Sequence, residues 1–321
     1  MKPAVDRVDA FQRRHPWLGF PLAVGYKFFD DQGAYLTALI TFYGFLSLFP
    51  MLLLLVTGLG YALEGDPQLQ RRVLDSALAR FPIVGDQLGG NVHSFHGNLF
   101  ALVAGVLLSL HGGLGVVQAA QYALNRMWGV PRDVRPNPFR SRARSLLLLT
   151  AGLAALLANT AAGIYLHGFW LLTTAAAVAV NALLLAVAFR VLTAYPLSLK
   201  QVRAGAIAAA LVLQVLQWGG TTLLGHMLKS ATATYGFFGI VLGLLTWIYL
   251  GALTVVLCAE VNVVRDRRLW PRSLLTPFTD DVELTRGDRR AYTAYAQSER
   301  HKGFERVDVD FDRPAGDEDG R

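Results

Sequence analysis

The chain has 321 residues, of which 53% are hydrophobic and 17% charged, and its formal net charge is +7. Soluble domains carry roughly 25% charged residues, so this composition favours a protein that resides in a membrane. The positive charge could serve nucleic acid, or it could come from basic loops that face anionic lipid. The single cysteine, Cys258, excludes an intramolecular disulfide and does not by itself make a zinc site.

The first apolar stretch, 34–63, contains thirty residues without Asp, Glu, Lys or Arg. As a helix it would be about 45 Å long, which exceeds the roughly 30 Å of hydrocarbon in a bilayer. No apolar core of a cleavable signal peptide precedes it, so we expect an uncleaved membrane span. Pro50 predicts a kink in this span, because a proline removes one backbone donor and clashes with the carbonyl of Leu46.

Two more polar segments flank the first span. In residues 1–33, apolar residues at helical spacing precede several aromatic residues. This pattern predicts either a segment lying in the membrane interface or a loosely ordered basic arm. Residues 64–95 carry apolar residues at helical spacing and predict an extracytoplasmic amphipathic helix. His93 and His96 could form a metal pair, but without a nearby Cys or carboxylate an ordinary pair of loop histidines is favoured.

The remaining apolar runs predict five further spans. The charge-free run 145–189 would extend about 67 Å as a single helix, which is enough for two crossings. The runs are 97–125, 145–189 for two spans, 204–228 and 236–259. We therefore predict an all-α membrane protein with a six-transmembrane-helix bundle. Its parts are an N-terminal arm (1–33), the transmembrane domain (34–264) and a polar cytoplasmic tail (265–321) that is largely disordered from residue 276.

Lys and Arg are distributed unequally between the two sets of loops. The N-terminal arm has five, the loop after the second span six, and the loop after the fourth span three. On the other side, the loop after the first span has three that four acids offset, the loop after the third has none, and the loop after the fifth has only Lys229. The positive-inside rule then places both termini in the cytoplasm and anionic phospholipid, rather than nucleic acid, at the basic loops.

Three stretches in these spans stand out together: YGFLSLFP at 43–50, ALNRMWGV at 123–130, and TWIYL at 246–250 followed by CAEVN at 258–262. Their identity and order resemble the YihY/BrkB family of bacterial inner-membrane proteins. Older schemes called that family ribonuclease BN, and others a virulence factor. The resemblance covers roughly residues 10–270. It implies a six-helix protein of the bacterial plasma membrane and no particular biochemical activity.

Two ionisable residues are predicted near the cytoplasmic edge of the hydrocarbon, Glu260 in the sixth span and Arg126 at the end of the second. We hypothesise that they pair, with Asn125 and Asn262 hydrogen-bonding around them. The pair would either border a polar cavity or act only as a clamp between helices. Arg126 could instead extend to a lipid phosphate.

Polar residues also follow one side of the first span. Tyr43, Ser47 and Pro50 recur at i, i+4 and i+7, so they share one face of the helix. This spacing predicts a polar seam facing an internal cavity. The alternative is that the Ser47 hydroxyl bonds back to its own helix beside the proline kink.

The fifth span contains both polar residues and glycines. Gln214 and Gln217 either extend the polar seam to a cavity between spans one, five and six, or join helices by hydrogen bonds. Gly219 and Gly220 permit either a broken helix, as at transporter sites, or close packing against a neighbouring helix.

These residues favour a transporter or lipid-handling protein. The alternative is a non-transporting scaffold whose basic loops and tail recruit partners or anionic lipid. Metal-dependent RNA cleavage needs clustered His and Asp ligands to activate water. The seven histidines are scattered along the chain. We therefore expect no enzymatic activity, no catalytic residue, no metal site and no cofactor.

Overall fold

The computed structural model describes residues 2–62, 99–165, 168–235, 237–279 and 282–311, and no side chains for 2–6, 49–62, 221–237 and most of 99–110. The described residues form helices and contain no strand. In chain order the helices are α1 (Lys2–Arg14), α2 (Pro16–Asp30), α3 (Gly33–Ala62), α6 (Leu99–Met127), the 3₁₀ turn η2 (Arg132–Val134), α7 (Pro138–Tyr165), α8 (Trp170–Leu192), α9 (Leu199–Tyr235), α10 (Phe237–Arg267) and α11 (Arg286–Ser298). The predicted all-α class is confirmed over these residues. The amphipathic helix predicted at 64–95, with His93 and His96, lies outside them.

Four helical stretches are long and apolar enough to cross a membrane: Pro138–Gly163, Trp170–Leu192, Leu199–Gly220 and Val241–Arg267. Helices α3 and α6 contain 30 and 29 residues, which corresponds to about 45 Å each. Because many of their side chains are not described, only the shorter apolar stretch Gly33–Leu48 of α3 is identified there. The chain is thus a multi-pass membrane protein with four candidate spans among the described residues. The count of six stays a prediction.

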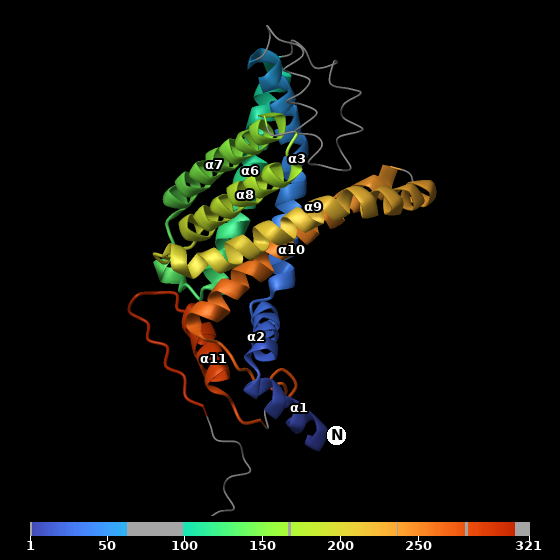
Figure 1. Cartoon of the computed structure of the whole chain (residues 1–321). Helices are drawn as coiled ribbons and strands as arrows, with labels where there is room; N and C mark the ends of the chain where they lie inside the picture. The colour runs from blue at the N-terminus through green and yellow to red at the C-terminus, as the bar shows by residue number, and fades with distance from the viewer. Residues whose placement is uncertain (1, 63–98, 166–167, 236, 280–281, 312–321) are drawn as a thin grey trace, which may run out of the picture.

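The long helices pack in antiparallel pairs, α3 with α6, α7 with α8, and α9 with α10 (Figure 1). Helix α10 also packs against α3, and α8 against α9. The far ends of α9 and α10 point away from the far ends of α3 and α6 (Figure 1). At the opposite end of the bundle lie α1, α2 and α11 (Figure 1). We call this end, together with the loop 128–137, the charged end.

The N-terminal arm contains two helices, and the second is part of the bundle. Helix α2 buries a face that includes Ala23, Val24 and Phe28, and this face packs against α10. The alternative of a loosely ordered arm is therefore wrong for α2, and its placement in the membrane interface stays a prediction. The sequence shows the apolar residues of α2, but it does not show the surface of α10 that covers them.

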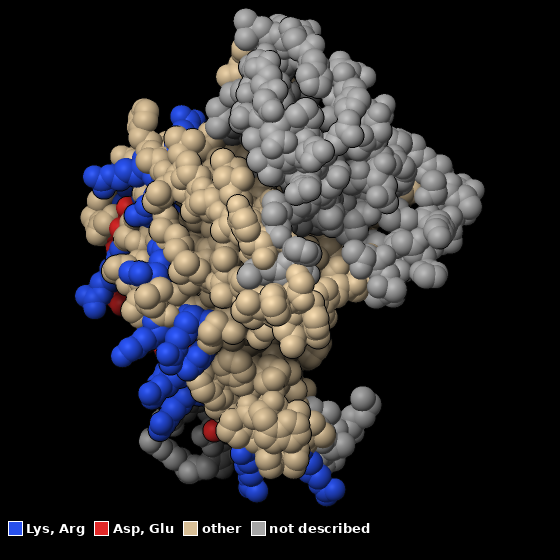
Figure 2. Space-filling view, turned by 45° about the horizontal axis from the view of Figure 1, so that its top comes forward, with Lys and Arg blue, Asp and Glu red and all other residues tan. Residues whose placement is uncertain are grey.

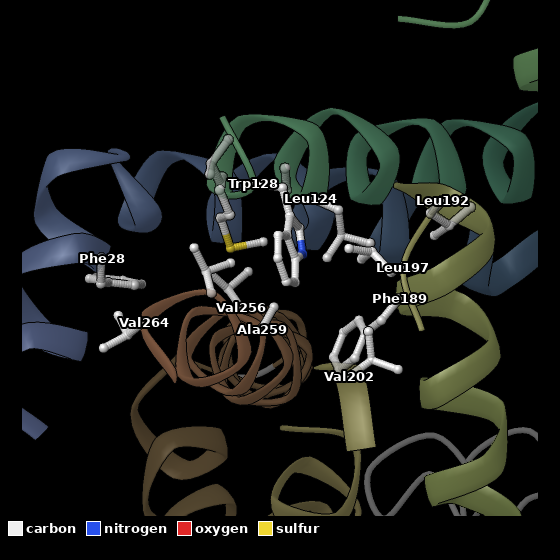
Figure 3. Packing of buried hydrophobic residues seen from close by; sticks show 14 of the residues in the cluster. Phe28, Leu124, Trp128, Phe189, Leu192, Leu197, Val202, Val256, Ala259 and Val264 are labelled. Atoms are coloured by element: carbon white, nitrogen blue, oxygen red, sulfur yellow. The ribbon is translucent and has the colours of Figure 1, made fainter. Parts of the chain in front are cut away.

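A buried hydrophobic core lies at the charged end, around α10. Figure 3 shows side chains from the neighbouring elements gathered around this helix. The labelled members are Phe28, Leu124, Trp128, Phe189, Leu192, Leu197, Val202, Val256, Ala259 and Val264. Trp128, Leu192 and Val202 are each at most 2% exposed. This core fixes the positions of the polar side chains that lie beside it.

Helices α9 and α10 approach each other closely at Gly205. A Cβ atom there would lie 2.0 Å from the carbonyl oxygen of Cys258 and 2.5 Å from Nδ2 of Asn262. The backbone N–H of Gly205 donates to Oδ1 of Asn262 at 2.7 Å. Only glycine leaves room for this contact between the two backbones.

We expect Gly205→Ala to lower the thermal stability of the detergent-solubilised protein, because a methyl group at this contact forces α9 away from α10. Overpacking of this kind costs about 1–3 kcal/mol. Gly152→Ala in α7 is the matched control, since a Cβ there meets nothing within 4 Å and alanine is favoured in helix interiors by about 0.5–1 kcal/mol. Equal melting temperatures for the two variants would contradict the close approach.

Candidate functional site

Helix α6 ends in a Schellman motif that places the residues around Arg126. The N–H of Val130 donates to the carbonyl of Asn125, and the N–H of Gly129 to that of Arg126, both at 2.8 Å. Gly129 has a φ of +58°, which lies in the left-handed region that favours glycine at a helix C-terminus. The reversal buries Trp128 in the core and leaves Arg126 at the end of the helix.

Arg126 connects α6 to two other elements of the charged end. Its Nε donates to the backbone oxygen of Asp31 at 3.1 Å, and its Nη2 donates to the hydroxyl of Tyr295 at 2.7 Å. Its Nη1 lies 3.6 Å from Oε1 of Glu299. The hypothesised Arg126–Glu260 pair is not among the ion pairs formed by the described residues. Arg126 is instead directed to the α2–α3 turn and to α11, which the sequence pattern gave no reason to place there.

Glu260 lies in α10 and is fully buried. Neither of its carboxyl oxygens accepts a hydrogen bond from a donor group of the protein. The charged groups that interact most strongly with the Glu260 carboxyl are Lys27 and Asp31. These two residues form an ion pair with each other. We call Lys27, Asp31 and Glu260 the buried triad. It holds one ammonium group and two carboxyl groups with almost no contact with solvent, an arrangement that is costly unless the charges are matched.

The sequence pattern singles out Glu260 but does not point to its two partners. Lys27 and Asp31 have i, i+4 spacing at the end of α2, which is a detectable signal for a helical ion pair. Burial raises the pKa of the Asp31 carboxyl, although the charge of Lys27 acts in the opposite direction. The side chains of Asp31 and Glu260 lie within hydrogen-bonding reach of each other.

Asn125 and Asn262 hold the helix ends beside the triad. Asn125 accepts a hydrogen bond from the N–H of Ala194 at 2.8 Å and donates to the carbonyl of Gln121 at 2.8 Å. Asn262 accepts from Gly205, as described above. Their hydrogen bonds therefore join α6 to the α8–α9 link and α10 to α9, in place of the predicted bonds to Arg126 and Glu260.

A cavity of about 210 Å³ adjoins the triad. Its lining combines three cations, two carboxylates and two tyrosines: Lys27, Arg126 and Arg267, Asp30 and Asp31, and Tyr292 and Tyr295. The tyrosines belong to α11. This helix forms one wall of the cavity, to which it also contributes Ala291, Ala294 and Ser298. We call this the charged-end cavity. It lies where α2, α6, α10 and α11 meet.

Helix α11 is held in place by a buried ion pair. Asp288 accepts a hydrogen bond from Nε of Arg272 at 2.5 Å, and Arg272 also pairs with Asp30 at 3.0 Å. Thr285 and Asp288 form a capping box at the start of the helix. Burial opposes the charge of Arg272, but Asp30 and Asp288 outweigh it and raise the pKa of the guanidinium. The predicted disorder is wrong for 286–298, because a buried charge partner and a cap order them.

The segment after α11 packs on the loop 128–137, which we call the arginine-rich loop. Arg300 pairs with Asp133 at 3.0 Å, and Arg132 pairs with Glu299 at 2.6 Å. The backbone N–H of Arg132 also donates to the carbonyl of Arg300 at 3.0 Å. Part of the positive charge that the sequence assigns to lipid is thus matched by the chain's own tail.

The polar seam of the first span faces α6. A Cβ atom at Gly112 would lie 2.7 Å from Cα of Ser47, and one at Gly115 would lie 2.4 Å from the ring of Tyr43. The hydroxyl of Ser47 donates to the carbonyl of Gly44 at 3.0 Å, as the back-bonding alternative expects. Pro50 lies within α3, and its side chain is outside the described part. Tyr43 and Ser47 therefore lie at a helix contact.

A second cavity, of about 260 Å³, lies between α8, α9 and α10. Two amide side chains, Asn181 and Gln217, line it together with Leu184, Leu185, Leu213, Leu216, Trp247 and Gly251. One turn away, Oε1 of Gln214 is buried and has no hydrogen-bond partner. We call this the amide cavity. It differs from the predicted cavity, because α8 takes the place of the first span.

The glycines of the fifth span serve packing. Helix α9 is continuous from Leu199 to Tyr235, so the predicted alternative of a break at Gly219 and Gly220 is wrong. A Cβ atom at Gly220 would lie 2.2 Å from the indole ring of Trp247. The missing side chain therefore admits Trp247, which also lines the amide cavity.

Comparison with known proteins gives one match. The family model described as Virulence factor BrkB matches residues 24–278, which agrees with the resemblance of the three sequence stretches. No curated protein and no solved structure matches the chain. The matched range includes the buried triad, the amide cavity and Arg272. It ends before α11.

We expect Arg272→Met to destabilise the protein, because it leaves Asp288 buried without its cation. Breaking a buried pair in this way costs about 3–5 kcal/mol, and hydrogen exchange should show α11 losing protection. Arg306→Met is the control, since Arg306 and Asp308 form an ion pair whose side chains are 86% and 71% exposed and exposed pairs contribute little. A melting temperature unchanged in both variants would argue against the buried pair.

Proposed function

We propose that this chain, which belongs to the Virulence factor BrkB family, is a six-span protein of the bacterial inner membrane that transports or handles a lipid-like amphiphile. The proposal places both termini in the cytoplasm. It takes the amide cavity as the binding site, in place of the cavity predicted between spans one, five and six. The amide cavity is the observation on which the proposal rests.

Polar side chains inside apolar helices are costly and tend to mark a pathway. The amide cavity combines two amides with four leucines and a tryptophan. Asn181 accepts a hydrogen bond from Asn159 of α7 at 3.1 Å. An amphiphile would bury its apolar part against the leucines, and its polar part would hydrogen-bond to Gln217 and to the remaining groups of this amide pair. The unpartnered Oε1 of Gln214 leaves a further acceptor nearby. A purely structural bundle would gain from replacing such groups with apolar ones.

The charge distribution supports the proposed orientation. In α7 to α10, every Lys or Arg with a described side chain lies near the same end of the bundle, and Figure 2 shows Lys and Arg gathered along one side. These residues are Arg140, Arg142, Arg144, Arg190, Lys200, Arg203, Arg265 and Arg267. Basic residues concentrate on the cytoplasmic side of bacterial spans. Arg140 and Arg142 are exposed at the start of α7, where anionic phospholipid headgroups would meet them.

A scaffold role is the second candidate, and the docked tail favours it. Deleting the whole tail, 276–321, would not separate the two roles, because it removes Asp288 from buried Arg272. Deleting 312–321 leaves the Arg272–Asp288 pair in place. The described residues contain no group of three or more His, Cys, Asp or Glu arranged to hold a metal. The absence of enzymatic activity stays a prediction.

The proposed orientation predicts which single cysteines react from outside intact cells. In a Cys258→Ala background, Tyr165→Cys should react with a membrane-impermeant maleimide from outside, because Tyr165 ends α7 away from the charged end and is 83% exposed. Lys302→Cys should react only after the cells are permeabilised. Labelling of Lys302→Cys in intact cells would reverse the orientation.

The proposed function predicts that the purified protein accelerates lipid exchange between leaflets. In vesicles with fluorescently labelled phosphatidylglycerol, dithionite added outside quenches only the lipid in the outer leaflet. The fluorescence of the inner-leaflet lipid should therefore fall faster in vesicles that contain the protein than in protein-free vesicles. The Asn181→Leu, Gln217→Leu double variant should slow this loss by about tenfold, as expected for a lost hydrogen bond of 1–3 kcal/mol.

Gln118→Leu is the matched control for the lipid assay. Gln118 is an exposed glutamine of α6, so the same chemical change there should leave the exchange rate unaltered. Equal rates in vesicles with and without wild-type protein would contradict lipid handling and favour the scaffold role.

A further inference from the structure

Asp31 and Glu260 bring two carboxyl groups together in a place without solvent. Asp31 is 1% exposed and Glu260 is 0% exposed. The two groups lie within hydrogen-bonding reach of each other, while no donor of the protein reaches either oxygen of Glu260. Ionised carboxylates can only accept hydrogen bonds. A stable contact between two of them requires a hydrogen atom on one.

Among the described residues no second cation bonds to either carboxyl group, although Arg126 and Arg267 lie close enough to act on Asp31 electrostatically. Lys27 is already bound to Asp31. The other charged groups nearby have partners of their own. Arg126 reaches Tyr295 and Glu299, Arg267 donates to the carbonyl of Trp128, and Asp30 pairs with Arg272. The triad therefore holds two acids against one ammonium, and full ionisation would leave a buried net charge of −1.

We propose that Asp31 and Glu260 hold one proton between them at neutral pH and together form a proton-binding site. The hydroxyl of one carboxyl donates to the carboxylate of the other, and the remaining negative charge is matched by Lys27. Release of the proton to water leaves both groups ionised, with repulsion between them and only Lys27 in direct contact to offset it.

The charged-end cavity provides a route for the proton. Lys27 and Asp31 line it, whereas Glu260 lies behind them in α10. The raised pKa of Asp31, caused by burial, is in the direction that the proposal needs. The presence of the proton does not depend on transport. Its use as the coupling ion rests on the proposed function.

Infrared difference spectroscopy of the full chain in lipid nanodiscs tests the site directly. The wild-type protein at neutral pH should show the carbonyl stretching band of a protonated carboxyl, shifted in heavy water and lost at alkaline pH. Glu260→Gln and Asp31→Asn should each abolish this band, because the remaining acid then pairs with Lys27 in its ionised form. Glu283→Gln, at an exposed position, should leave the band unchanged.

Absence of the band from the wild-type protein would overturn the proposal, and this measurement does not depend on whether the variants fold. A band that survives in either the Glu260 or the Asp31 variant would also overturn it, because the proton would then belong to a single residue. The band and the lipid assay are separate readouts. If the protein shows the band but moves no lipid, the proposed function is wrong and the proton-binding site stands. If it moves lipid but lacks the band, only the proton-binding site is wrong.

Discussion

An ionised side chain leaves water only at a large energetic cost, and this constraint organises the molecule. The described Lys and Arg side chains of α7 to α10 all lie near one end of the bundle, where water and lipid phosphates can solvate them. Charges that are buried occur in matched groups. Arg272 is fully buried between Asp30 and Asp288, and Lys27 is buried against Asp31. Glu260 is the exception, which makes it the informative residue of the chain.

Helix α10 connects the features that concern function. Its far half contributes Trp247 and Gly251 to the amide cavity, and its near half carries Glu260 and Arg267. Gly251 and Glu260 are nine residues apart, or about 13 Å along the helix. A movement of α10 would therefore act on both places together. The contact of α10 with α9 at Gly205 and the core around Trp128 hold α10 against its neighbours.

The tail makes the charged end a closed structure. Helix α11 forms one wall of the charged-end cavity and supplies Asp288 to Arg272, yet it lies beyond the range 24–278 that the family model covers. Tyr295 and Glu299 of the tail contact Arg126. The Glu299–Arg132 and Arg300–Asp133 pairs join the tail to the arginine-rich loop. The basic residues between α6 and the first turns of α7 are thus divided between internal pairs and exposed positions such as Arg140 of α7.

The sequence by itself determined the helical class, the apolar spans of α7 to α10, the family and the presence of an acid, Glu260, in an apolar run, because each depends on local hydrophobicity, on short motifs or on one charge among apolar residues. Only the tertiary structure decided the partners. Arg272 meets Asp30 and Asp288, and Glu260 meets the local Lys27–Asp31 pair, through contacts between different elements. Nothing local directs Arg126 to α11 rather than to Glu260. The same holds for Gln217, which lines a cavity with Asn181 rather than with Tyr43 because α8, and not α3, packs beside α9. Periodicity shows which face of a helix is polar, but the packing of the other helices decides what that face meets.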